Sequence, residues 1–508
     1  MYPGFHALAH PERPAVIIAE TGEMVTYREL DDRSIRLANL WHDRGLRRGD
    51  RVAILLENHP RYFEVVWAAL RSGLYYTPIN THLTRDEIGY ILDDCEARCL
   101  VTSEPFLDRV EGLATEISLL IGADADGFDR YEDLLAAASS HPRDDQPEGS
   151  GMFYSSGTTG RPKGILFPLP DREVSDPNPM VMPDSPLGLH GDAVYLSPAP
   201  LYHTSPVVTG TIVHRYGGTV VVMKTWDAQR CLLAIETYKC DTAQFVPTMF
   251  VRLLKLPAVV RERYDLSSLR QVSHAAAPCP VEIKQRMMQW WGPIIWEFYA
   301  GSENVGSTSI GPTEWLEHPG SVGRGRFCQV HICGDDGVDL PTGEIGDIWF
   351  DTPTAKMEYH HNPEATAAAM NDRGWYTMGD VGRLDEDGYL YLLDRRSFMI
   401  ISGGVNVYPQ EAENVLIMHD AVADVAVIGV PDDDLGEVAK AIVEVADGVT
   451  ADAALAAGLL DFCAQQLAPY KCPRSVDFTD TLPRQDTGTL YKRLLRDRYW
   501  GDRESRIV

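Results

Sequence analysis

YSSGTTGRPKG, residues 154–164, is the stretch of this chain that restricts its interpretation most strongly. Its glycines let the backbone turn tightly and bring N–H groups close to a phosphate. Its hydroxyl side chains add hydrogen-bond donors, and Lys163 adds a positive charge suited to a polyphosphate. The stretch therefore predicts a phosphate-binding loop that is formed by Ser155, Ser156, Gly157, Thr158, Thr159, Gly160 and Lys163.

Two other interpretations of this loop fit less well. A Walker A loop is excluded, because no Gly-Lys-Ser/Thr follows at the required spacing. A flexible surface linker is the ordinary alternative. Such linkers rarely combine four hydroxyl side chains, three glycines and Pro-Lys-Gly within eleven residues, so phosphate binding is favoured.

Outward from the loop, strand-like and helical segments alternate. Arg51–Leu56 and Thr219–Met223 are short apolar runs typical of buried strands, and Tyr62–Arg71 has helical spacing. Alternation of this kind predicts α/β layers around largely parallel sheets. Gly374–Ser397 reads as a turn-rich region that separates this part from the rest.

Beyond the turn-rich region the pattern restarts. Glu411–Met418 is predicted to be a helix, and Val422–Val430 and Val438–Val445 are predicted to be strands. A boundary near Asp394 follows, with an N-terminal domain of residues 1–394 and a small C-terminal domain of residues 395–508. Both lengths are compatible with independent folding units.

The composition excludes several classes of partner. The formal net charge is −28, from 46 basic and 74 acidic residues, and so much negative charge repels nucleic acids and anionic membranes. The first twenty residues do not resemble a secretory signal and no run is long enough for a membrane span, so we expect a cytoplasmic protein. The nine cysteines are scattered; Cys95 and Cys99 have no second ligand pair nearby, which indicates buried small hydrophobes rather than a zinc site.

The phosphate loop resembles the signature of the adenylate-forming superfamily: acyl-CoA synthetases, luciferases and adenylation domains of nonribosomal peptide synthetases. Thr26–Leu30 and Gly49–Ala53 look like the opening of that family, and its later motifs follow in order along the whole chain. The resemblance implies an α/β fold whose large N-terminal domain contains layered sheets and a β-barrel-like part. It also implies a small, mobile α+β C-terminal domain.

The resemblance assigns residues to ATP and Mg²⁺. Residues 274–280 resemble the turn that lies against adenine, with Ala275, Ala276, Ala277 and Pro278 in contact; a tight strand–helix turn after Leu269–Ser273 is the alternative. Residues 298–303 resemble the next motif, in which Tyr299 stacks on adenine beside Gly301 and Ser302. Glu303 ligates Mg²⁺ there; alone it would read as a surface acid.

Further motifs complete the implied site. Asp380 resembles the acid that accepts hydrogen bonds from the ribose hydroxyls, and Arg395 the basic partner that reaches ribose or phosphate; a turn acid and a surface ion pair are the alternatives. His203 resembles the residue that closes the acyl pocket, although it also fits a core histidine. Residues 402–406, with Glu411, look like the segment that forms a CoA tunnel.

Three positions depart from the family pattern. Thr489 stands where the family has a lysine that approaches the reacting carboxylate and α-phosphate, and Lys492 is expected to point elsewhere. Ala300 replaces the usual glycine, which would crowd the acyl end of the pocket, and Ser397 and Phe398 alter the hinge on which the small domain rotates. An engineered Thr489 would account for that position alone, and the intact phosphate loop, Glu303, Asp380 and Arg395 argue against an inactive homologue. Altered chemistry, in which an unusual acid is passed to an acceptor other than CoA, is the third explanation.

The resulting hypothesis is an ATP- and Mg²⁺-dependent ligase. Its catalytic residues are predicted to be Lys163, Thr159, His203, Glu303 and the position of Thr489. It activates a small-molecule acid as the AMP anhydride, releases pyrophosphate and passes the acid to a nucleophile; the default is a carboxylic acid and CoA. A diazotase that activates nitrite for attack by an arylamine, and a non-catalytic ATP-binding homologue, are the alternatives. A monomer and a homodimer are both compatible with the sequence.

Overall fold

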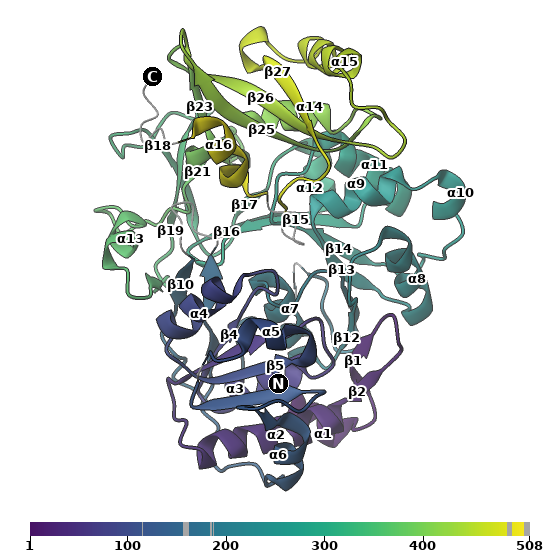
Figure 1. The fold of residues 1–508 in the computed structure, drawn as a ribbon, viewed down its shortest axis with the longest axis vertical. Helices are drawn as coiled ribbons and strands as arrows, with labels where there is room; N and C mark the ends of the chain where they lie inside the picture. Colours follow the sequence, from purple (N-terminus) through teal and green to yellow (C-terminus); the bar gives the residue numbers. More distant parts are fainter. Residues whose placement is uncertain (114, 156–161, 183–184, 186, 485–489, 502–508) are drawn as a thin grey trace.

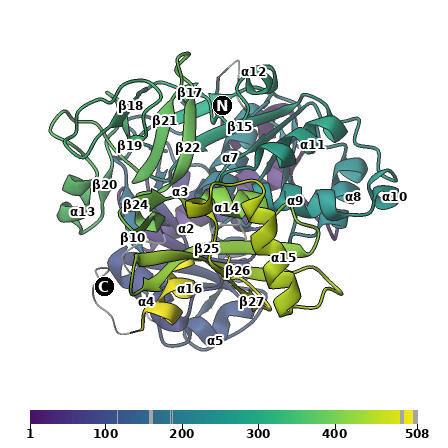
Figure 2. The same ribbon diagram turned by 90° about the horizontal axis from the view of Figure 1, so that it is seen from above.

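The fold was analysed in a computed structural model of residues 1–508, in which residues 114, 156–161, 183–184, 186, 485–489 and 502–508 are not described. A large N-terminal part contains most of the sheets, and the C-terminal elements lie at one end of the long axis (Figure 1). Seen from above, these C-terminal elements cover the middle of the larger part (Figure 2). The predicted class, mixed α/β with a large N-terminal and a smaller C-terminal domain, is confirmed.

Two sheets rich in parallel strands dominate the N-terminal part. The nine-stranded sheet has the order β17 (Arg324–Gly325), β16 (Ser307–Ile310), β15 (Ile295–Ala300), β14 (Gln271–His274), β13 (Thr242–Phe245), β11 (Val194–Ser197), β12 (Thr219–Val222), β1 (Pro14–Ile18), β2 (Met24–Thr26). The six-stranded sheet has the order β7 (Asp129–Arg130), β6 (Ile117–Ile121), β5 (Ala97–Ser103), β3 (Arg51–Leu55), β4 (Tyr75–Pro78), β8 (Ser150–Gly151). The strands predicted at Arg51–Leu56 and Thr219–Met223 are therefore present.

Helices alternate with these strands, as the sequence pattern predicts. They are α1 (Pro3–Ala9), α2 (Tyr27–Asp43), α3 (Tyr62–Leu70), α4 (Arg85–Asp94), α5 (Leu107–Val110), α6 (Tyr131–Ala137), α7 (Thr204–Tyr216), α8 (Ala228–Tyr238), α9 (Pro247–Lys255), α10 (Ala258–Arg261), α11 (Val281–Trp291), α12 (Pro312–Glu317) and α13 (Pro363–Ala368). A capping box starts α2, because the Thr26 side chain accepts from the Glu29 N–H and Glu29 accepts from the Thr26 N–H.

One apolar core holds the two sheets together. It contains Val16 of β1 and Val52 of β3, with Trp67 of α3 and Val213 of α7 between them, all fully buried. Helices α3 and α7 approach so closely that a Cβ at Gly210 would lie 2.3 Å from the Phe63 ring. The rings of Phe63 and Trp67 and the small Gly210 thus allow the nine-stranded and six-stranded sheets to pack closely.

Two smaller sheets complete the N-terminal part. One has the order β20 (Glu358–Tyr359), β10 (Lys163–Leu166), β9 (Phe153–Ser155); the other has the order β18 (Gln329–Cys333), β19 (Gly346–Asp351), β21 (Asp380–Leu384), β22 (Leu390–Arg395) and is antiparallel. The region Gly374–Ser397, predicted to be turn-rich, contains turns but also the paired strands β21 and β22. Its glycines suggest turns, but buried Val381 and Leu390 anchor the strands in the core.

The C-terminal elements form a sheet of their own. Its order is β24 (Val405–Val407), β23 (Ile400–Ser402), β26 (Gly436–Val445), β25 (Val422–Asp432), and β27 (Ser475–Thr479) also pairs with β26. Helices α14 (Pro409–Leu416), α15 (Ala453–Ala464) and α16 (Lys492–Trp500) contact this sheet. The helix and the two long strands predicted here are confirmed.

The two parts meet at a few polar contacts. The carboxylate of Asp394, at the end of β22, accepts a hydrogen bond of 3.1 Å from the backbone N–H of Gln410 in α14. The ammonium of Lys255, at the end of α9, donates to the carbonyl of Ala423, 3.3 Å away. None of the helices in the described part of the chain has the length and apolarity required to cross a membrane.

Candidate active site

A cleft of about 2260 Å³ lies between the sheets and beneath the C-terminal elements. The residues predicted to bind ATP, Mg²⁺ or the acid, where the structure describes them, all line it: Ser155, Lys163, His203, Ala275, Ala276, Ala277, Pro278, Tyr299, Gly301, Ser302, Glu303, Asp380 and Arg395. Ser156, Gly157, Thr158, Thr159, Gly160 and Thr489 lie outside the described residues. Motifs spread over more than 200 positions thus meet in one place.

The nine-stranded sheet brings these motifs together. Strands β11, β13, β14 and β15 are neighbours and run parallel. The segments that follow β11, β14 and β15 therefore leave the sheet at the same edge, and they carry His203, Ala275–Pro278 and Gly301–Glu303. The carboxyl edge of an open parallel sheet is where such folds bind ligands.

The phosphate-loop sequence connects two paired strands. Ser155 at the end of β9 pairs with Lys163 at the start of antiparallel β10, so the two ends of the phosphate-loop sequence lie side by side. The Lys163 ammonium lies 5.4 Å from the centre of the Tyr359 ring, which attracts a cation through its π face. The Tyr359 hydroxyl donates a hydrogen bond of 3.0 Å to Oε1 of Glu303. One tyrosine thus positions both the predicted phosphate-binding lysine and the predicted metal ligand.

Asp380 has a partner on each carboxylate oxygen. Tyr299 donates a hydrogen bond of 2.6 Å to Oδ2, and Nε of Arg395 lies 3.4 Å from Oδ1. Burial raises the pKa of Asp380 above its ordinary value, although the Arg395 guanidinium opposes the shift. Burial and the nearby Asp380 raise the pKa of Tyr299, so its hydroxyl keeps its proton as a donor. A fixed carboxylate beside an aromatic ring suits a nucleoside.

The turn after β14 has a strained backbone. Ala276 adopts φ = 74°, a left-handed conformation that an alanine pays for in steric energy, and its side chain is exposed in the cleft. Small residues flank it on both sides, so a flat ligand can approach the backbone closely. Non-glycine residues in such conformations cluster at functional sites, which agrees with the predicted role of this turn.

A buried ionic cluster under that turn was missed by the sequence analysis. The Lys284 ammonium of α11 lies 2.7 Å from Oε2 of Glu297 in β15, and Nε2 of His274 in β14 lies 3.3 Å from the same oxygen. Burial opposes ionisation of Glu297, but Lys284 and His274 lower its pKa to about 2. Lys284 shares the apolar face of α11 with Ile283 and Met287. A lysine among the apolar residues of a helix indicates a buried charge, and this was the sequence feature that could have predicted the cluster.

The residues after β15 leave little space. A Cβ at Gly301 would lie 2.4 Å from Sδ of Met378 and 2.6 Å from Oε2 of Glu303, so a larger residue would force both side chains, one of them the predicted metal ligand, to shift. The Ser302 hydroxyl is 2.9 Å from the Thr204 hydroxyl, which joins this segment to α7. Ala300, which is expected to crowd the acyl end of the pocket, is exposed in the cleft.

A polar network that the sequence analysis missed lies on the acyl side. The Gln244 side chain donates to the Ser205 hydroxyl over 2.6 Å and accepts from the Thr209 hydroxyl over 3.2 Å. These residues line the cleft together with apolar side chains that include Tyr202, Val208, Ile212, Met180, Leu187 and Val251. A single buried glutamine creates no periodic pattern in the sequence, so Gln244 could not be recognised as a site residue.

Residues near the C-terminal end of the chain line part of the cleft. Arg484 and Leu490, which flank residues 485–489, both line it. Lys492, expected to point elsewhere, lines the cleft, and its ammonium lies 2.7 Å from Oε1 of Glu413 and over the Phe398 ring. Residues 402–406 and Glu411, expected to form a CoA tunnel, are absent from the described lining of the cleft, and residues 403–404 connect β23 to β24.

Comparisons with known proteins agree with this geometry. Residues 5–360 match the family described as AMP-binding enzyme, and residues 411–489 match its C-terminal domain. A feruloyl-CoA synthase from Amycolatopsis sp is 35% identical over 493 residues, covering 96% of each chain.

Solved structures show the same fold. ATP-bound MatB from Rhodopseudomonas palustris is similar with a TM-score of 0.80 and 28% identity over 99% of each chain. The amide bond synthetase McbA from Marinactinospora thermotolerans is similar with a TM-score of 0.79 and 26% identity, over 98% of this chain and 99% of that one. The chain therefore belongs to the AMP-binding enzyme family and is an AMP-forming acid ligase.

Proposed function

We propose that this enzyme activates a carboxylic acid with ATP and transfers the acyl group to CoA. The observation that carries the proposal is the convergence of Lys163, Glu303 and Asp380 on one cleft, linked through Tyr359 and Tyr299. A cation, a metal-ligating acid and a ribose acceptor are the groups needed to bind a nucleoside triphosphate. The similarity to acid–CoA ligases supplies the default acceptor.

The site residues take the following roles in this proposal. Adenine lies between the 275–278 turn and the Tyr299 ring, and the ribose hydroxyls bond to Asp380 with Arg395 nearby. Lys163 and the loop 155–160 hold the phosphates, and His203 borders the acid. Domains of residues 1–394 and 395–508 would meet over the cleft, with Asp394 at the junction.

A divalent cation fits beside Glu303. This carboxylate is a hard oxygen ligand of the kind Mg²⁺ prefers, and it faces the same cleft as Lys163. Tyr359 engages Oε1 and leaves the second oxygen for ligation. Mg²⁺ would neutralise phosphate charge there.

In this proposal the residues of the site promote the displacement of pyrophosphate from ATP. A carboxylate oxygen of the acid attacks the α-phosphorus of ATP, the bond to the bridging oxygen breaks, and pyrophosphate leaves with the negative charge. Lys163 stabilises that charge electrostatically, which is a major source of rate in phosphoryl chemistry. CoA thiolate attacks the acyl carbon next and AMP leaves.

The acid is proposed to be aromatic or arylalkenoic. The acyl side of the cleft is lined mainly by apolar side chains, and the Gln244 amide can recognise one polar substituent. The feruloyl-CoA synthase relative acts, by its name, on an acid of that class. A medium-chain fatty acid would fill the apolar surface but leave the Gln244 network without a ligand.

A different acceptor is the second candidate. Thr489 stands at the position of the family lysine, and Ala300 is exposed in the cleft. The similar structure McbA is, by its title, an amide bond synthetase, which supports an acceptor other than CoA. Nitrite activation for attack by an arylamine belongs to this second candidate.

One screen tests these proposals. ATP-dependent pyrophosphate release is measured with cinnamic, benzoic and fatty acids and with nitrite plus an arylamine, each with and without CoA. Release with an aromatic acid and thioester formation with CoA is the expected result. Turnover with nitrite and an arylamine, and none with any carboxylic acid, would reverse the assignment.

A further inference from the structure

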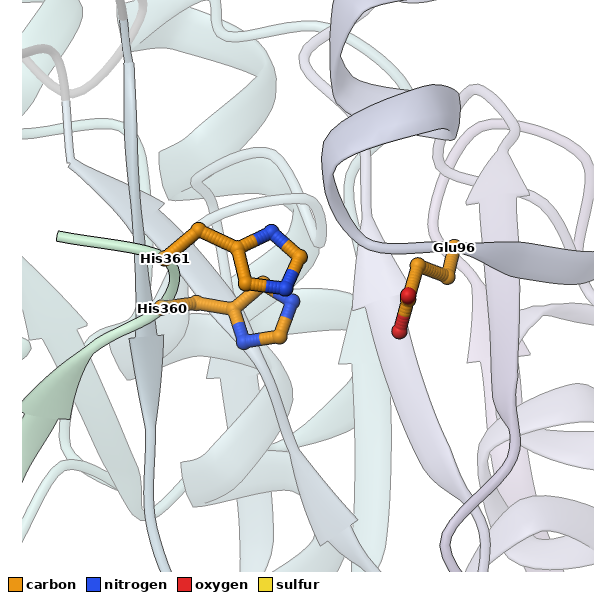
Figure 3. Close-up of side chains that lie close together, drawn as sticks. All are labelled: Glu96, His360 and His361. Atoms are coloured by element: carbon orange, nitrogen blue, oxygen red, sulfur yellow. The ribbon is translucent and has the colours of Figure 1, made fainter.

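A cluster of side chains that could ligate a metal ion lies outside the described lining of the active-site cleft. Glu96, His360 and His361 each offer a ligand atom, and these atoms lie within 4.8 Å of one another. Figure 3 shows the two imidazole rings one above the other, with the Glu96 carboxylate directed toward them from the opposite side. The ring centres of His360 and His361 are 3.7 Å apart.

Distant parts of the chain supply the three residues. Glu96 occupies the turn between α4 and β5, and the two histidines follow β20 directly. Glu96 and His361 both have left-handed backbones, with φ of 51° and 52°. Such conformations cost energy in non-glycine residues and are retained where the surrounding structure uses them.

His360 provides the independent sign of a ligand. Its side chain is only 9% exposed, and its Nε2 atom has no hydrogen-bond partner within the described part of the chain. A buried polar atom without a partner is destabilising, so native proteins normally satisfy it with a bond, a water or an ion. A metal ion between the imidazoles and the carboxylate satisfies the ring nitrogen.

Glu96 is already oriented for such a role. Nη1 of Arg51 lies 3.0 Å from its Oε2 atom, and the Arg51 guanidinium stacks 6.0 Å from the centre of the Tyr75 ring. The other carboxylate oxygen is left for a metal. Hydrogen-bonded partners of this kind commonly hold metal-ligating carboxylates in place.

We propose that Glu96, His360 and His361 form a binding site for a divalent transition-metal ion, with Zn²⁺ as the ion of choice. Two imidazoles and one carboxylate are a common zinc ligand set and leave a fourth position for water. The harder ions Mg²⁺ and Ca²⁺ prefer all-oxygen sites and should bind poorly. This site is separate from the Mg²⁺ site proposed at Glu303.

The bound ion would clamp a segment that reaches the active site. The backbone N–H of His360 donates a hydrogen bond of 2.8 Å to the carbonyl oxygen of Gly164, which follows Lys163. Tyr359, which precedes His360, contacts both Lys163 and Glu303. An ion bound to Glu96 would therefore fix β20 and β10 against the α4–β5 turn.

Zn²⁺ binding to the full chain tests the site. Metal-free protein is titrated with Zn²⁺ by calorimetry, and the wild type should bind one ion at micromolar or lower concentration. His361→Ala and Glu96→Gln, both at exposed positions, should each weaken binding by about 10- to 100-fold or more. His141→Ala, at another exposed histidine, is the matched control and should bind as the wild type does.

Hydrogen exchange tests the clamp in the same samples. Zn²⁺ should slow exchange in peptides covering residues 162–167 and 356–362 of the wild type, and not of His361→Ala. Absence of binding, or binding that His361→Ala and Glu96→Gln leave unchanged, would overturn the site. Binding without slower exchange would overturn the clamp. Neither readout depends on ATP, so failure here is separate from failure of the proposed ligase function.

Discussion

The Tyr299 hydroxyl donates a hydrogen bond of 2.6 Å to Oδ2 of Asp380, and this bond joins the ring proposed to face adenine to the carboxylate proposed to face ribose. The two residues come from β15 and the start of β21, in different sheets. Their contact means that the proposed nucleoside site is already assembled in the absence of ATP. Substitutions of Asp380 and of Tyr299 should both weaken ATP binding, and the two effects should differ in size.

Asp380→Asn should raise the KM for ATP by about 10- to 100-fold, because a hydrogen bond to a charged group contributes about 1.5–3 kcal/mol. Tyr299→Phe keeps the ring and loses a single hydroxyl, so its KM for ATP should rise less than tenfold. Initial rates of pyrophosphate release over a range of ATP concentrations measure both. A larger effect of Tyr299→Phe than of Asp380→Asn would contradict the ribose assignment.

Lys163→Ala should lower ATP-dependent pyrophosphate release by about 10²- to 10³-fold, the usual effect of losing one preorganised charge-stabilising group. Thr159→Ala should lower it as well. Lys163 begins β10, next to the loop sequence that contains Thr159, so circular dichroism should show an unchanged fold. Lys224→Ala, at an exposed lysine away from the cleft, is the control. Unchanged release in both loop variants would remove the loop from phosphate binding.

Glu303→Gln should increase the Mg²⁺ concentration needed for half-maximal activity by about tenfold or more, because the amide keeps the shape but loses the charge that binds the ion. Tyr359→Phe retains the carboxylate and should shift this concentration much less. Mg²⁺ titrations of pyrophosphate release compare the three proteins. Identical Mg²⁺ dependence in Glu303→Gln and wild type would exclude Glu303 as a metal ligand.

Glu297→Gln should destabilise the folded protein by about 3–5 kcal/mol at neutral pH, because it leaves Lys284 buried without its counter-charge. The pKa of Glu297 is lowered to about 2 from an ordinary 4.5. Its ionisation thus contributes stability that is complete above pH 4.5 and is lost as the pH falls toward 2.

The difference between wild type and Glu297→Gln in thermal unfolding should accordingly be largest above pH 4.5 and shrink below it. Glu282→Gln, an exposed acid on the same helix, is the control. Addition of Lys284→Met to Glu297→Gln should restore part of the lost stability, since the unpaired charge is removed. A difference that is equal at pH 3 and pH 7 would rule out the ionised pair.

Thr489→Lys separates the two candidate acceptors. If the chain is a CoA ligase that lacks only this charge, thioester formation from a carboxylic acid should rise by about 10- to 1000-fold. If the site evolved for another acid or acceptor, Ala300 and Ser397 still misplace the reactants and no such gain follows. The measurement is thioester yield over a panel of acids, beside product formation from nitrite and an arylamine.

A large thioester gain without any nitrite-dependent product would eliminate the altered-chemistry alternative. ATP-consuming turnover of nitrite and arylamine by the wild type would eliminate the simple CoA ligase. Because fold similarity does not fix the reaction, this result decides the acceptor.

The sequence by itself determined the class of the protein. Residues 154–164 and the ordered motifs after them predicted a phosphate loop and an adenylate-forming fold, and the family match and the shared cleft agree. Strand and helix positions were also predictable, such as the strand expected at Val422–Val430 and found at Val422–Asp432, because burial on a sheet or along a helix imposes a period on neighbouring residues.

The tertiary structure alone decided which residues meet. Lys163 and Glu303 both contact Tyr359, Glu297 pairs with Lys284, and Glu96 faces His360. None of these contacts follows from local periodicity, since each depends on the order of strands in a sheet and on the packing of one sheet against another. Residue type and spacing specify elements, whereas ion pairs and ligand sites form where distant elements are brought together.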